Sequence, residues 1–431
     1  MSREVISVAA SGKIHQEKQS KVLVLAILSA VPVIMVLGNS MLIPVLPTIQ
    51  SDLKISPLQV SLLITLFSIP AGIIIPLSGI LSDRYGRKRV IAPSLLLYGA
   101  GGLLTGFAAI WGEGVYWLML TGRIIQGIGA AGTAPIAMAL VSDLYKKEER
   151  SSALGVIEAA NGFGKVISPI LGSLIALITW YALFFTFPIL TVPIALSLWF
   201  FIQEPKQNRN PQPLSKYREN IVKTWNKDGR WLLVTFLAGA LTLFILFGVL
   251  FFLSDFLEKR YGIDGVVKGL VLAIPLLAMS SVSLWAGNHV KQKIQTMKRF
   301  IVTGLFIVAI GMALVPFLSN TYFLIADLVG IGIGSGLILP CLNTLITSAV
   351  GSKERGIITS LYGSVRFLGV ALGPPVFGAL AKAKLLLYLG NAGLALVTGI
   401  LVIWAIRKPE RLRSPHGHSR LYLGRKRLRP T

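Results

Sequence analysis

The chain has 431 residues, of which 54% are hydrophobic and only 14% are charged. A soluble domain carries about a quarter charged residues, so a soluble fold this apolar would lack the polar surface to cover itself. The mean hydropathy of +0.71 and apolar blocks long enough to span a bilayer as helices exclude a cytosolic enzyme, a secreted disulfide scaffold and a disordered chain. The net charge of +24 does not indicate nucleic-acid binding, because the basic residues lie in short segments between the apolar blocks.

The apolar blocks predict an all-α membrane protein with twelve transmembrane helices in two parallel six-helix repeats. We expect the first six helices at about 22–46, 58–80, 90–111, 116–141, 152–178 and 181–202. We expect the second six at about 231–257, 267–288, 300–318, 321–348, 357–381 and 385–406. The predicted domains are an N-terminal half (1–202), a cytoplasmic linker (203–230), a C-terminal half (231–406) and a basic tail (407–431). The linker is expected to be either flexible or partly an interfacial helix.

The distribution of Lys and Arg predicts the orientation in the membrane. If the N-terminus is cytoplasmic, 33 of the 42 Lys and Arg residues lie in cytoplasmic segments and six lie in external ones. We therefore expect both termini in the cytoplasm and the basic tail against anionic lipid headgroups of the cell membrane. The first apolar block continues past Leu42 without a small-residue cleavage pattern, so no signal peptide is predicted. The single cysteine, Cys341, leaves no disulfide framework, and no metal site is expected.

The two halves repeat one another at an offset of 205 residues. The matched positions are Gly127 with Gly332, Gly129 with Gly334, Pro135 with Pro340, Glu149-Arg150 with Glu354-Arg355, Gly164 with Gly369 and Pro169 with Pro374. The offset covers six helices, which is an even number, so both halves are expected to have the same orientation. A binding site is then expected between the halves at mid-membrane depth.

The segment after the second predicted helix reads Gly-Ile-Leu-Ser-Asp-Arg-Tyr-Gly-Arg-Lys-Arg. Its second glycine permits a tight turn, and its basic residues favour a cytoplasmic loop. The segment resembles the signature G-x-L-a-D-r-x-G-r-k of the major facilitator superfamily. The resemblance implies a transporter that works by alternating access, in which this loop is a latch that holds the outward-facing state. The latch residues are Gly79, Asp83, Arg84, Gly86 and Arg87.

Two further motifs resemble those of the twelve-helix drug:proton antiporters of that superfamily. The run Leu37–Pro47 looks like their helix 1 motif, and Arg123–Ala131 resembles their helix 4 motif R-x-x-q-G-x-g-a-a. The resemblance implies that Arg123 faces the cavity and takes part in proton transfer. Because an arginine inside a membrane span is costly, a functional role is the default. The alternative is a structural arginine bonded to helix 1 groups such as Asn39.

The fifth predicted helix is similar to the antiporter motif g-x-x-x-G-P-x-x-G-G, which marks exporters. Ser168 and Ser173 replace two of its glycines, but serine is also small, so close helix packing remains possible. Glycine and proline allow a helix to bend, which would suit a rocking motion of the two halves. The predicted bending residues are Gly164, Pro169, Gly172, Gly369, Gly373 and Pro374.

Ionisable residues inside the predicted spans are candidates for function. Glu158, Asn161 and Lys165 recur at the spacing of one helix face. We assign proton coupling, with Glu158 as the carrier and Asp327 as its rival, to Glu158, Arg123, Lys165 and Asp327. We expect the substrate cavity to be lined by Asn39, Arg123, Asn161, Lys165, Asn343 and Arg366. The alternative is that the charges pair with one another and serve only packing.

The sequence contains no Walker A phosphate loop, metal-ligand cluster or nucleophile–base pair, so we expect neither an enzyme nor a cofactor. The resemblance implies a monomer in the bilayer that exports small lipophilic compounds, as in multidrug efflux, in exchange for protons. The alternatives are an exporter of one metabolite, a flippase for a lipid-linked sugar and a non-transporting sensor or scaffold. Helix 1 has no acid and the buried charges sum to +1, which favours neutral or weakly acidic substrates.

Overall fold

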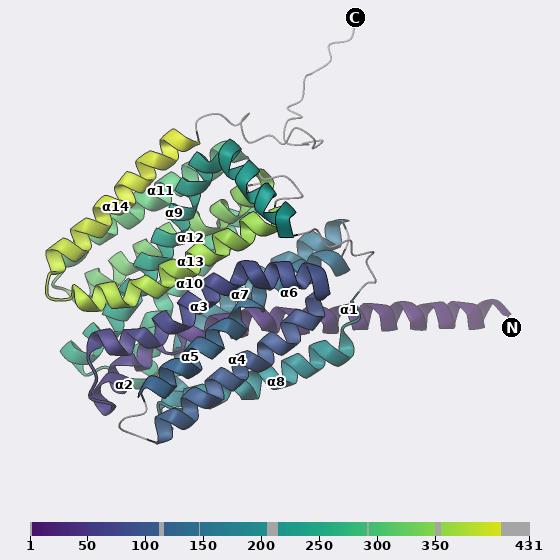
Figure 1. The fold of residues 1–431 in the computed structure, drawn as a ribbon, viewed down its shortest axis with the longest axis horizontal. Helices are drawn as coiled ribbons and strands as arrows, with labels where there is room; N and C mark the ends of the chain where they lie inside the picture. The colour runs from purple at the N-terminus through teal and green to yellow at the C-terminus, as the bar shows by residue number, and fades with distance from the viewer. Residues whose placement is uncertain are drawn as a thin grey trace, which may run out of the picture. The chain divides into compact units, whose positions relative to one another are not determined.

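The computed structural model describes residues 2–111, 116–145, 147–204, 214–290, 293–349 and 355–406, and these residues form helices joined by short turns (Figure 1). Those residues contain twelve helical segments long and apolar enough to cross a membrane, and this confirms the predicted all-α fold with twelve transmembrane helices. The spans are Lys21–Asp52, Pro57–Tyr85, Arg87–Ile110, Tyr116–Leu144, Ser152–Ala176, Ala182–Phe201, Asp228–Tyr261, Gly265–Val290, Ile294–Phe317, Thr321–Ser348, Arg355–Ala379 and Lys384–Ala405.

The chain divides into two units. Unit 1 comprises Met1–Pro211 and Leu257–Ala273, and unit 2 comprises Gln212–Phe256 and Ile274–Thr431. The helices of unit 1 are α1 (Ser2–Ser40), η1 (Ile43–Val45), α2 (Leu46–Asp52), α3 (Pro57–Tyr85), α4 (Arg87–Ile110), α5 (Tyr116–Ala131), α6 (Ala134–Leu144), α7 (Lys147–Ala176) and α8 (Ala182–Phe201). The remaining helices are α9 (Leu214–Tyr261), α10 (Gly265–Val290), α11 (Ile294–Leu314), η2 (Val315–Phe317), α12 (Thr321–Ala349), α13 (Arg355–Ala379) and α14 (Lys384–Ala405).

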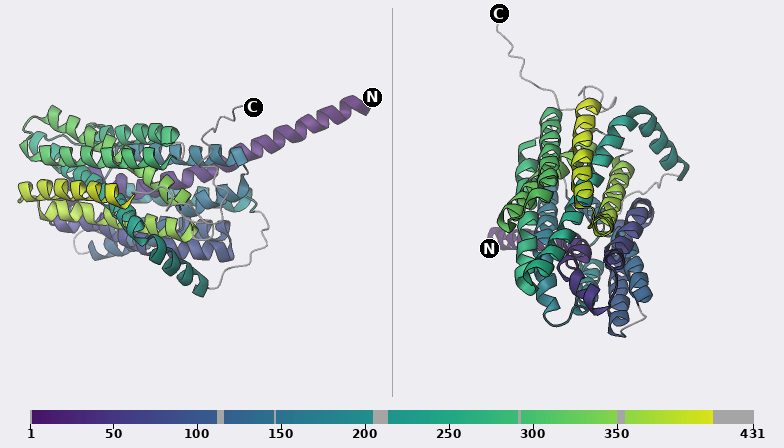
Figure 2. Two further views of the ribbon diagram at one scale, coloured as in Figure 1. Left: turned by 90° about the horizontal axis from the view of Figure 1, so that it is seen from above. Right: turned by 90° about the vertical axis from the view of Figure 1, so that its left-hand side faces the viewer.

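Within each unit the helices pack side by side. In unit 1, α4 lies between α5 and α8, and α1 packs against α7; in unit 2, α11 packs against both α12 and α14 (Figures 1 and 2). The predicted linker is helical from Leu214 onward, because α9 runs as one helix through it and into the seventh span. The predicted basic tail, 407–431, lies outside the described residues.

Two spans that the hydropathy pattern predicts as single helices are interrupted at prolines. The first span passes from α1, which ends at Ser40, through η1 to α2, and this stretch contains Pro44 and Pro47. The fourth span breaks at Thr133, and Pro135 lies in the first turn of α6. Proline has no N–H to donate to the preceding turn and its ring clashes with that turn, so each break has a local cause.

The segment predicted as a cytoplasmic loop after the second helix is almost entirely helical. The helix α3 continues to Tyr85 and α4 begins at Arg87, so only Gly86 separates them. Gly86 has a φ of 114°, a conformation that side chains with a Cβ rarely adopt. The loop predicted from hydropathy was therefore too long, because polar residues continue these helices into the region outside the apolar core.

The 205-residue repeat corresponds to equivalent close helix contacts in the two units. A Cβ added to Gly127 of α5 would lie 2.1 Å from the carbonyl oxygen of Phe67 on α3, and one added to Gly332 of α12 would lie 2.3 Å from the carbonyl oxygen of Pro275 on α10. Small residues let helices approach closely in a membrane. The repeated glycines therefore hold the same pair of helices together in each unit.

The glycines predicted to permit bending also lie at close helix contacts. Gly172 on α7 faces the carbonyl oxygen of Met41, and Gly369 on α13 faces that of Ala240 on α9, each closer than a Cβ could tolerate. Gly373 faces the carbonyl oxygen of Phe244 on α9 in the same way, whereas a Cβ on Gly164 would lie 3.2 Å from Cα of Val33 on α1, a tight but less severe contact. Pro169 and Pro374 lie inside continuous helices. These contacts fix how α7 and α13 present their polar faces.

Candidate functional site

Arg123 is fully buried in unit 1 and its guanidinium is bonded to three helices. Nε donates to the carbonyl oxygen of Leu63 on α3 over 2.7 Å, and Nη2 donates to the carbonyl oxygen of Gly38 over 2.9 Å and to Oδ1 of Asn39 over 2.8 Å, both on α1. Nη1 donates to Oε1 of Gln126, one turn along α5, over 2.5 Å. Arg123 therefore joins α5 to α1 and α3, and these partners are all neutral.

The surroundings of Arg123 are aromatic and polar. The guanidinium carbon lies 4.5 Å from the ring centroid of Phe67, and the Asn39 amide donates to Oγ of Ser68 over 2.7 Å. Tyr98 donates its hydroxyl to the carbonyl oxygen of Ile34 over 3.0 Å. Together these contacts hold Asn39, which we predicted to line the cavity, as a buried connector between α1, α3 and α5.

The predicted polar face of the fifth span lies on α7. Glu158 is exposed, whereas Asn161 and Lys165, which follow it on the same face, are half-buried. The neighbouring face of α7 carries the buried Ile157 and Ser168, and it packs toward α1. The helix therefore presents these three polar residues beside its packed face, with the carboxyl of Glu158 open to its surroundings.

In unit 2 the structure brings together Arg366 of α13 and Asn343 of α12, both of which we predicted to line the cavity. Nη1 of Arg366 donates to Oδ1 of Asn343 over a long distance of 3.4 Å. The guanidinium carbon lies 5.4 Å from the ring centroid of Tyr362, one turn earlier on α13. Tyr362 is buried and packs on Phe236 of α9. Sequence reasoning missed Tyr362, although it lies on the same helix face as Arg366.

Asp327 does not pair with Arg366. Arg366 contacts α12 at Asn343, sixteen positions beyond Asp327, which corresponds to about 24 Å along a helix. The Asp327 carboxyl instead lies at the contact between α12 and α11, beside Gly311. Its Oδ2 is buried and has no hydrogen-bond partner within the described ranges. The alternative in which these two charges neutralise each other is therefore wrong.

The latch residues form a network at one end of unit 1. Nη1 of Arg87 lies 2.5 Å from Oδ1 of Asp83, one turn earlier, and donates to Oγ of Ser82 over 2.6 Å. Nε of Arg87 also lies 3.4 Å from Oδ2 of Asp143, at the end of α6. Arg84 is exposed in the last turn of α3. The network joins α3, α4 and α6 through the guanidinium of Arg87.

Glu204 completes this network, and sequence reasoning missed it. Its carboxylate accepts hydrogen bonds from the backbone N–H of Arg87 over 2.8 Å and of Lys88 over 3.4 Å. These are the first N–H groups of α4, which have no partner within the helix, and a negative charge is favourable at a helix N-terminus. An acid directly after the sixth span was the available signal, but its partners lie 117 and 116 positions away.

A second ion cluster, also missed from sequence, surrounds Lys268 on α10. Its ammonium is fully buried and lies 2.5 Å from Oε2 of Glu258 and 3.0 Å from Oδ1 of Asp264. Burial raises the pKa of Asp264, but the Gly265 N–H and the Lys268 ammonium outweigh that effect, and the pKa is lowered overall. The next residue, Gly269, packs against Pro169 of α7. The cluster therefore ties the start of α10 to the end of α9.

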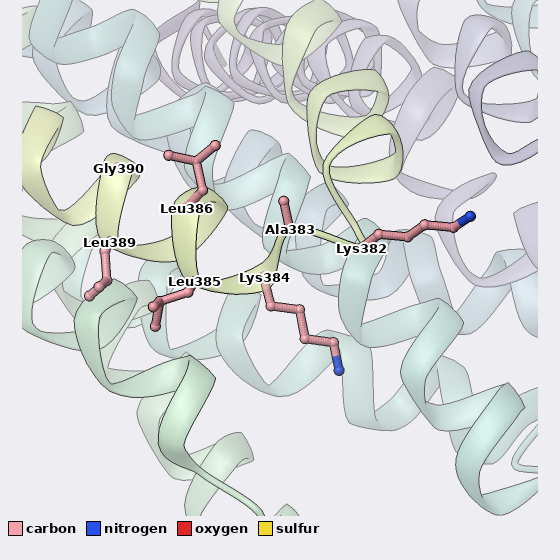
Figure 3. Close-up of a pocket in the computed structure, with 7 residues that line it drawn as sticks. All are labelled: Lys382, Ala383, Lys384, Leu385, Leu386, Leu389 and Gly390. Atoms are coloured by element: carbon pink, nitrogen blue, oxygen red, sulfur yellow. The ribbon is translucent and has the colours of Figure 1, made fainter.

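A surface depression at the turn between α13 and α14 is not a convincing binding site. Its lining comes from one stretch of chain, and its leucines and lysines point in different directions rather than toward a common centre (Figure 3). The lining residues are Lys382, Ala383, Lys384, Leu385, Leu386, Leu389 and Gly390. Exposed leucines on a transmembrane helix are expected to face lipid. No group of three or more His, Cys, Asp or Glu residues in the described chain could hold a metal ion.

Comparisons with known proteins agree with this architecture. Among solved structures, the chain resembles a bacterial homologue of the human lysosomal transporter Spinster, with a TM-score of 0.67 and 17% identity over 90% of this chain and 95% of that one. It also resembles a D-xylose–proton symporter, with a TM-score of 0.69 and 15% identity over 88% of this chain and 96% of that one. At these identities the likeness shows a shared fold.

Sequence relatives are closer. The chain is 43% identical to the bacillibactin exporter of Bacillus subtilis over 88% of this chain and 95% of that protein. It is 26% identical to the class C tetracycline resistance protein of Escherichia coli over 80% of this chain and 87% of that protein. The family model described as Major Facilitator Superfamily matches residues 28–374 and, in a second match, 298–430. The chain is therefore a multi-pass membrane protein that belongs to the major facilitator superfamily of transporters, as its loop signature predicted.

Proposed function

We propose that this chain exports one kind of small organic compound, bacillibactin or a compound closely similar to it, across the cell membrane in exchange for protons. The observation that carries the proposal is the 43% identity to the bacillibactin exporter of Bacillus subtilis, which extends over nearly the whole of both chains. The proposal selects the single-metabolite alternative over multidrug efflux. Export is also supported by the glycine and proline pattern of α7, which resembles the exporter motif.

Multidrug efflux is the second candidate function. It is favoured by the helix 1, helix 4 and helix 5 motifs, and by 28% identity to the multidrug efflux protein YfmO of Bacillus subtilis over 81% of this chain. The two candidates differ in how much the rate of transport varies among compounds. A specific exporter rejects compounds that leave its buried polar groups unpaired, whereas a mainly apolar cavity discriminates weakly.

We assign the coupled proton to Glu158, with Asp327 as the rival. A carrier must exchange its proton with water on each side of the membrane in turn, and the carboxyl of Glu158 is exposed on the polar face of α7. The half-buried Lys165 lies two turns further along that face, about 10 Å away, so the two groups can respond to each other as water enters. Asp327 lies between α11 and α12 with its Oδ2 buried, so its carboxyl is less accessible to water than that of Glu158.

Transport by the purified protein in liposomes tests the function. Bacillibactin and tetracycline are compared as substrates, each with and without an imposed pH gradient, with empty liposomes as the control. We expect gradient-driven accumulation of bacillibactin and little movement of tetracycline. Equal transport of both compounds would establish multidrug efflux instead, and transport unaffected by the gradient would reject proton exchange.

The carrier is tested by removing its proton. Glu158→Gln keeps the shape of the side chain, so it should abolish uphill transport but leave downhill exchange of bacillibactin measurable. Glu219→Gln on α9 is the matched control, because Glu219 is also an exposed acid but precedes the seventh span. If Glu158→Gln still concentrates the substrate and Asp327→Asn does not, the coupling role belongs to Asp327.

A further inference from the structure

One face of α13 carries three polar groups whose hydrogen-bonding capacity is unused. Thr359, Tyr362 and Arg366 are spaced by three and four residues, so their side chains lie on one side of the helix. The hydroxyl oxygens of Thr359 and Tyr362 and Nε of Arg366 are all buried, and none has a hydrogen-bond partner in the described part of the chain. Buried polar groups are normally paired, so three orphans on one helix face need an explanation.

The two intramembrane arginines differ sharply in how well they are satisfied. Arg123 uses all three of its guanidinium nitrogens in hydrogen bonds of 2.5 to 2.9 Å. Arg366 makes a single bond, 3.4 Å long, to the neutral amide of Asn343, and it pairs with no acid in the described ranges. A guanidinium carries five N–H donors and no acceptor. Most of the N–H donors of the positively charged Arg366 guanidinium are therefore available to a ligand.

The surrounding helices hold these groups in place. The Tyr362 ring is packed so tightly on α9 that a Cβ added to Gly239 would lie 2.6 Å from its Cε2 and 2.8 Å from its hydroxyl oxygen. The ring of Phe236 also packs against that of Tyr362 in a tilted arrangement, with 5.8 Å between the centroids. The hydroxyl of Tyr362 is thus fixed by packing rather than by a hydrogen bond. Such a pre-positioned donor costs little to order when a ligand binds.

The depth of Arg366 identifies the source of the ligand. Arg366 is eleven residues from the start of α13 and thirteen from its end, which places it roughly 16–20 Å from either end of the helix. That is near the middle of a hydrocarbon core about 30 Å thick, far from lipid headgroups. A group that satisfies several donors and balances one positive charge is an oxyanion, and at this depth it would belong to a compound that enters the protein.

We propose that Arg366, Tyr362, Thr359 and Asn343 form a binding subsite for an oxyanion group, such as a carboxylate, on the exported compound. This subsite deepens the proposed function and rests on it in one respect, namely that the compound transported is a small organic molecule. The oxyanion accepts hydrogen bonds from the guanidinium of Arg366 and from the hydroxyls of Tyr362 and Thr359. Asn343 keeps the guanidinium oriented between α12 and α13.

Binding of a matched pair of probes to the full-length protein tests the subsite. The probes are 2-naphthoate and 2-naphthamide, which share a ring system but differ in charge, and binding is measured by equilibrium dialysis in phosphatidylcholine nanodiscs. We expect the wild type to bind 2-naphthoate at least about tenfold more tightly than 2-naphthamide, because the neutral amide oxygen accepts weaker hydrogen bonds from the guanidinium than a carboxylate does. Equal binding of the two probes would overturn the proposal.

Variants identify the residues that cause the preference for 2-naphthoate over 2-naphthamide. Arg366→Gln should abolish the preference for 2-naphthoate, and Tyr362→Phe should weaken 2-naphthoate binding about threefold to tenfold while leaving 2-naphthamide binding unchanged. Arg299→Gln is the matched control, because it removes the same charge from an exposed position on α11, and it should keep the preference. Arg366→Lys, which retains the charge, should keep part of it and serves if the glutamine variant does not fold. A preference that survives in Arg366→Gln, or that is untouched by both Arg366→Lys and Tyr362→Phe, would overturn the proposal.

Two further comparisons separate the possible explanations. If phosphatidylglycerol in the nanodiscs displaces 2-naphthoate, the site holds a lipid headgroup, and the assignment to the exported compound is wrong. Failure of the subsite can also be distinguished from failure of the proposed function. Failure to transport bacillibactin, together with an Arg366-dependent preference, would reject the substrate but not the subsite; transport of bacillibactin without that preference would reject the subsite alone.

Discussion

Nη2 of Arg123 donates a hydrogen bond to Oδ1 of Asn39 over 2.8 Å, and this bond links α5 to α1 inside unit 1. The same nitrogen also serves the carbonyl oxygen of Gly38, and Nε serves that of Leu63. A planar guanidinium can reach all of these acceptors at once, whereas an ammonium is a compact point charge. The contact therefore predicts that Arg123 cannot be replaced by lysine without loss of stability.

We expect Arg123→Lys to destabilise the protein by about 1–3 kcal/mol for each acceptor left unpaired, seen as a lower unfolding temperature in detergent. Arg299→Lys, at an exposed position, should leave that temperature unchanged. If Arg123→Lys unfolds at the wild-type temperature but loses transport, the residue acts in proton transfer rather than in holding α1, α3 and α5 together.

The glycine repeat gives a prediction with a built-in control. Gly127→Ala and Gly332→Ala each place a Cβ against a backbone carbonyl oxygen that cannot move aside, and overpacking of this kind costs about 1–3 kcal/mol. Gly390→Ala on α14 meets no atom within 4 Å and should be neutral or slightly stabilising. The unfolding temperatures of the three variants separate a clash at a helix contact from a general effect of replacing glycine by alanine. Equal unfolding temperatures for all three variants would refute the contact.

The latch contact predicts a loss of function without a loss of fold. Asp83→Asn removes the carboxylate that lies 2.5 Å from Nη1 of Arg87, but Arg87 remains held by Ser82 and Asp143. A charge-assisted hydrogen bond contributes about 1.5–3 kcal/mol, so an equilibrium between two conformations that depends on it would shift about tenfold to a hundredfold. We expect unchanged expression and greatly slowed transport in liposomes. Normal turnover would show that the contact serves packing alone.

The buried cluster around Lys268 predicts an asymmetric response to mutation. Glu258→Gln leaves the Lys268 ammonium fully buried, with Asp264 as its remaining acidic partner. Removing one partner of a buried ion pair typically costs about 3–5 kcal/mol. Lys268→Met removes the charge itself and should cost less, because the remaining carboxylates are partly exposed. Unfolding temperatures in detergent measure both. A greater loss in Lys268→Met would contradict the prediction.

The orientation predicted from the Lys and Arg distribution is tested with fusions. A reporter enzyme that is active only in the cytoplasm should work when it is fused after Lys216 or after Arg427, and should be silent after Ser319. These positions fall in the predicted linker, the basic tail and the loop after the ninth span. Activity after Ser319 would reverse the orientation or change the number of spans before it.

The amino-acid sequence alone was sufficient for the twelve spans, the six-plus-six repeat and the superfamily. These features depend on hydropathy, on the spacing of small residues and on a short loop motif, all of which are properties of nearby positions in the chain. Helix interruptions were also encoded locally, by Pro44 and Pro135, but hydropathy does not register them. The length of the loop at Gly86 was misjudged for a related reason, because polar residues outside the apolar core can still be helical.

Only the tertiary structure decided which polar groups meet. Arg123 and Arg366 look alike in sequence, since each is an arginine inside an apolar block. Yet Arg123 makes hydrogen bonds through all three of its guanidinium nitrogens, whereas Nε of Arg366 has no partner in the described residues. Asp327 and Arg366 could have paired by composition, but the helix contacts separate them. The reason is geometric. Successive side chains on a helix point about 100° apart, so the rotation of each helix about its own axis decides which polar groups meet. That rotation is set by the close glycine contacts between helices and not by the polar residues themselves.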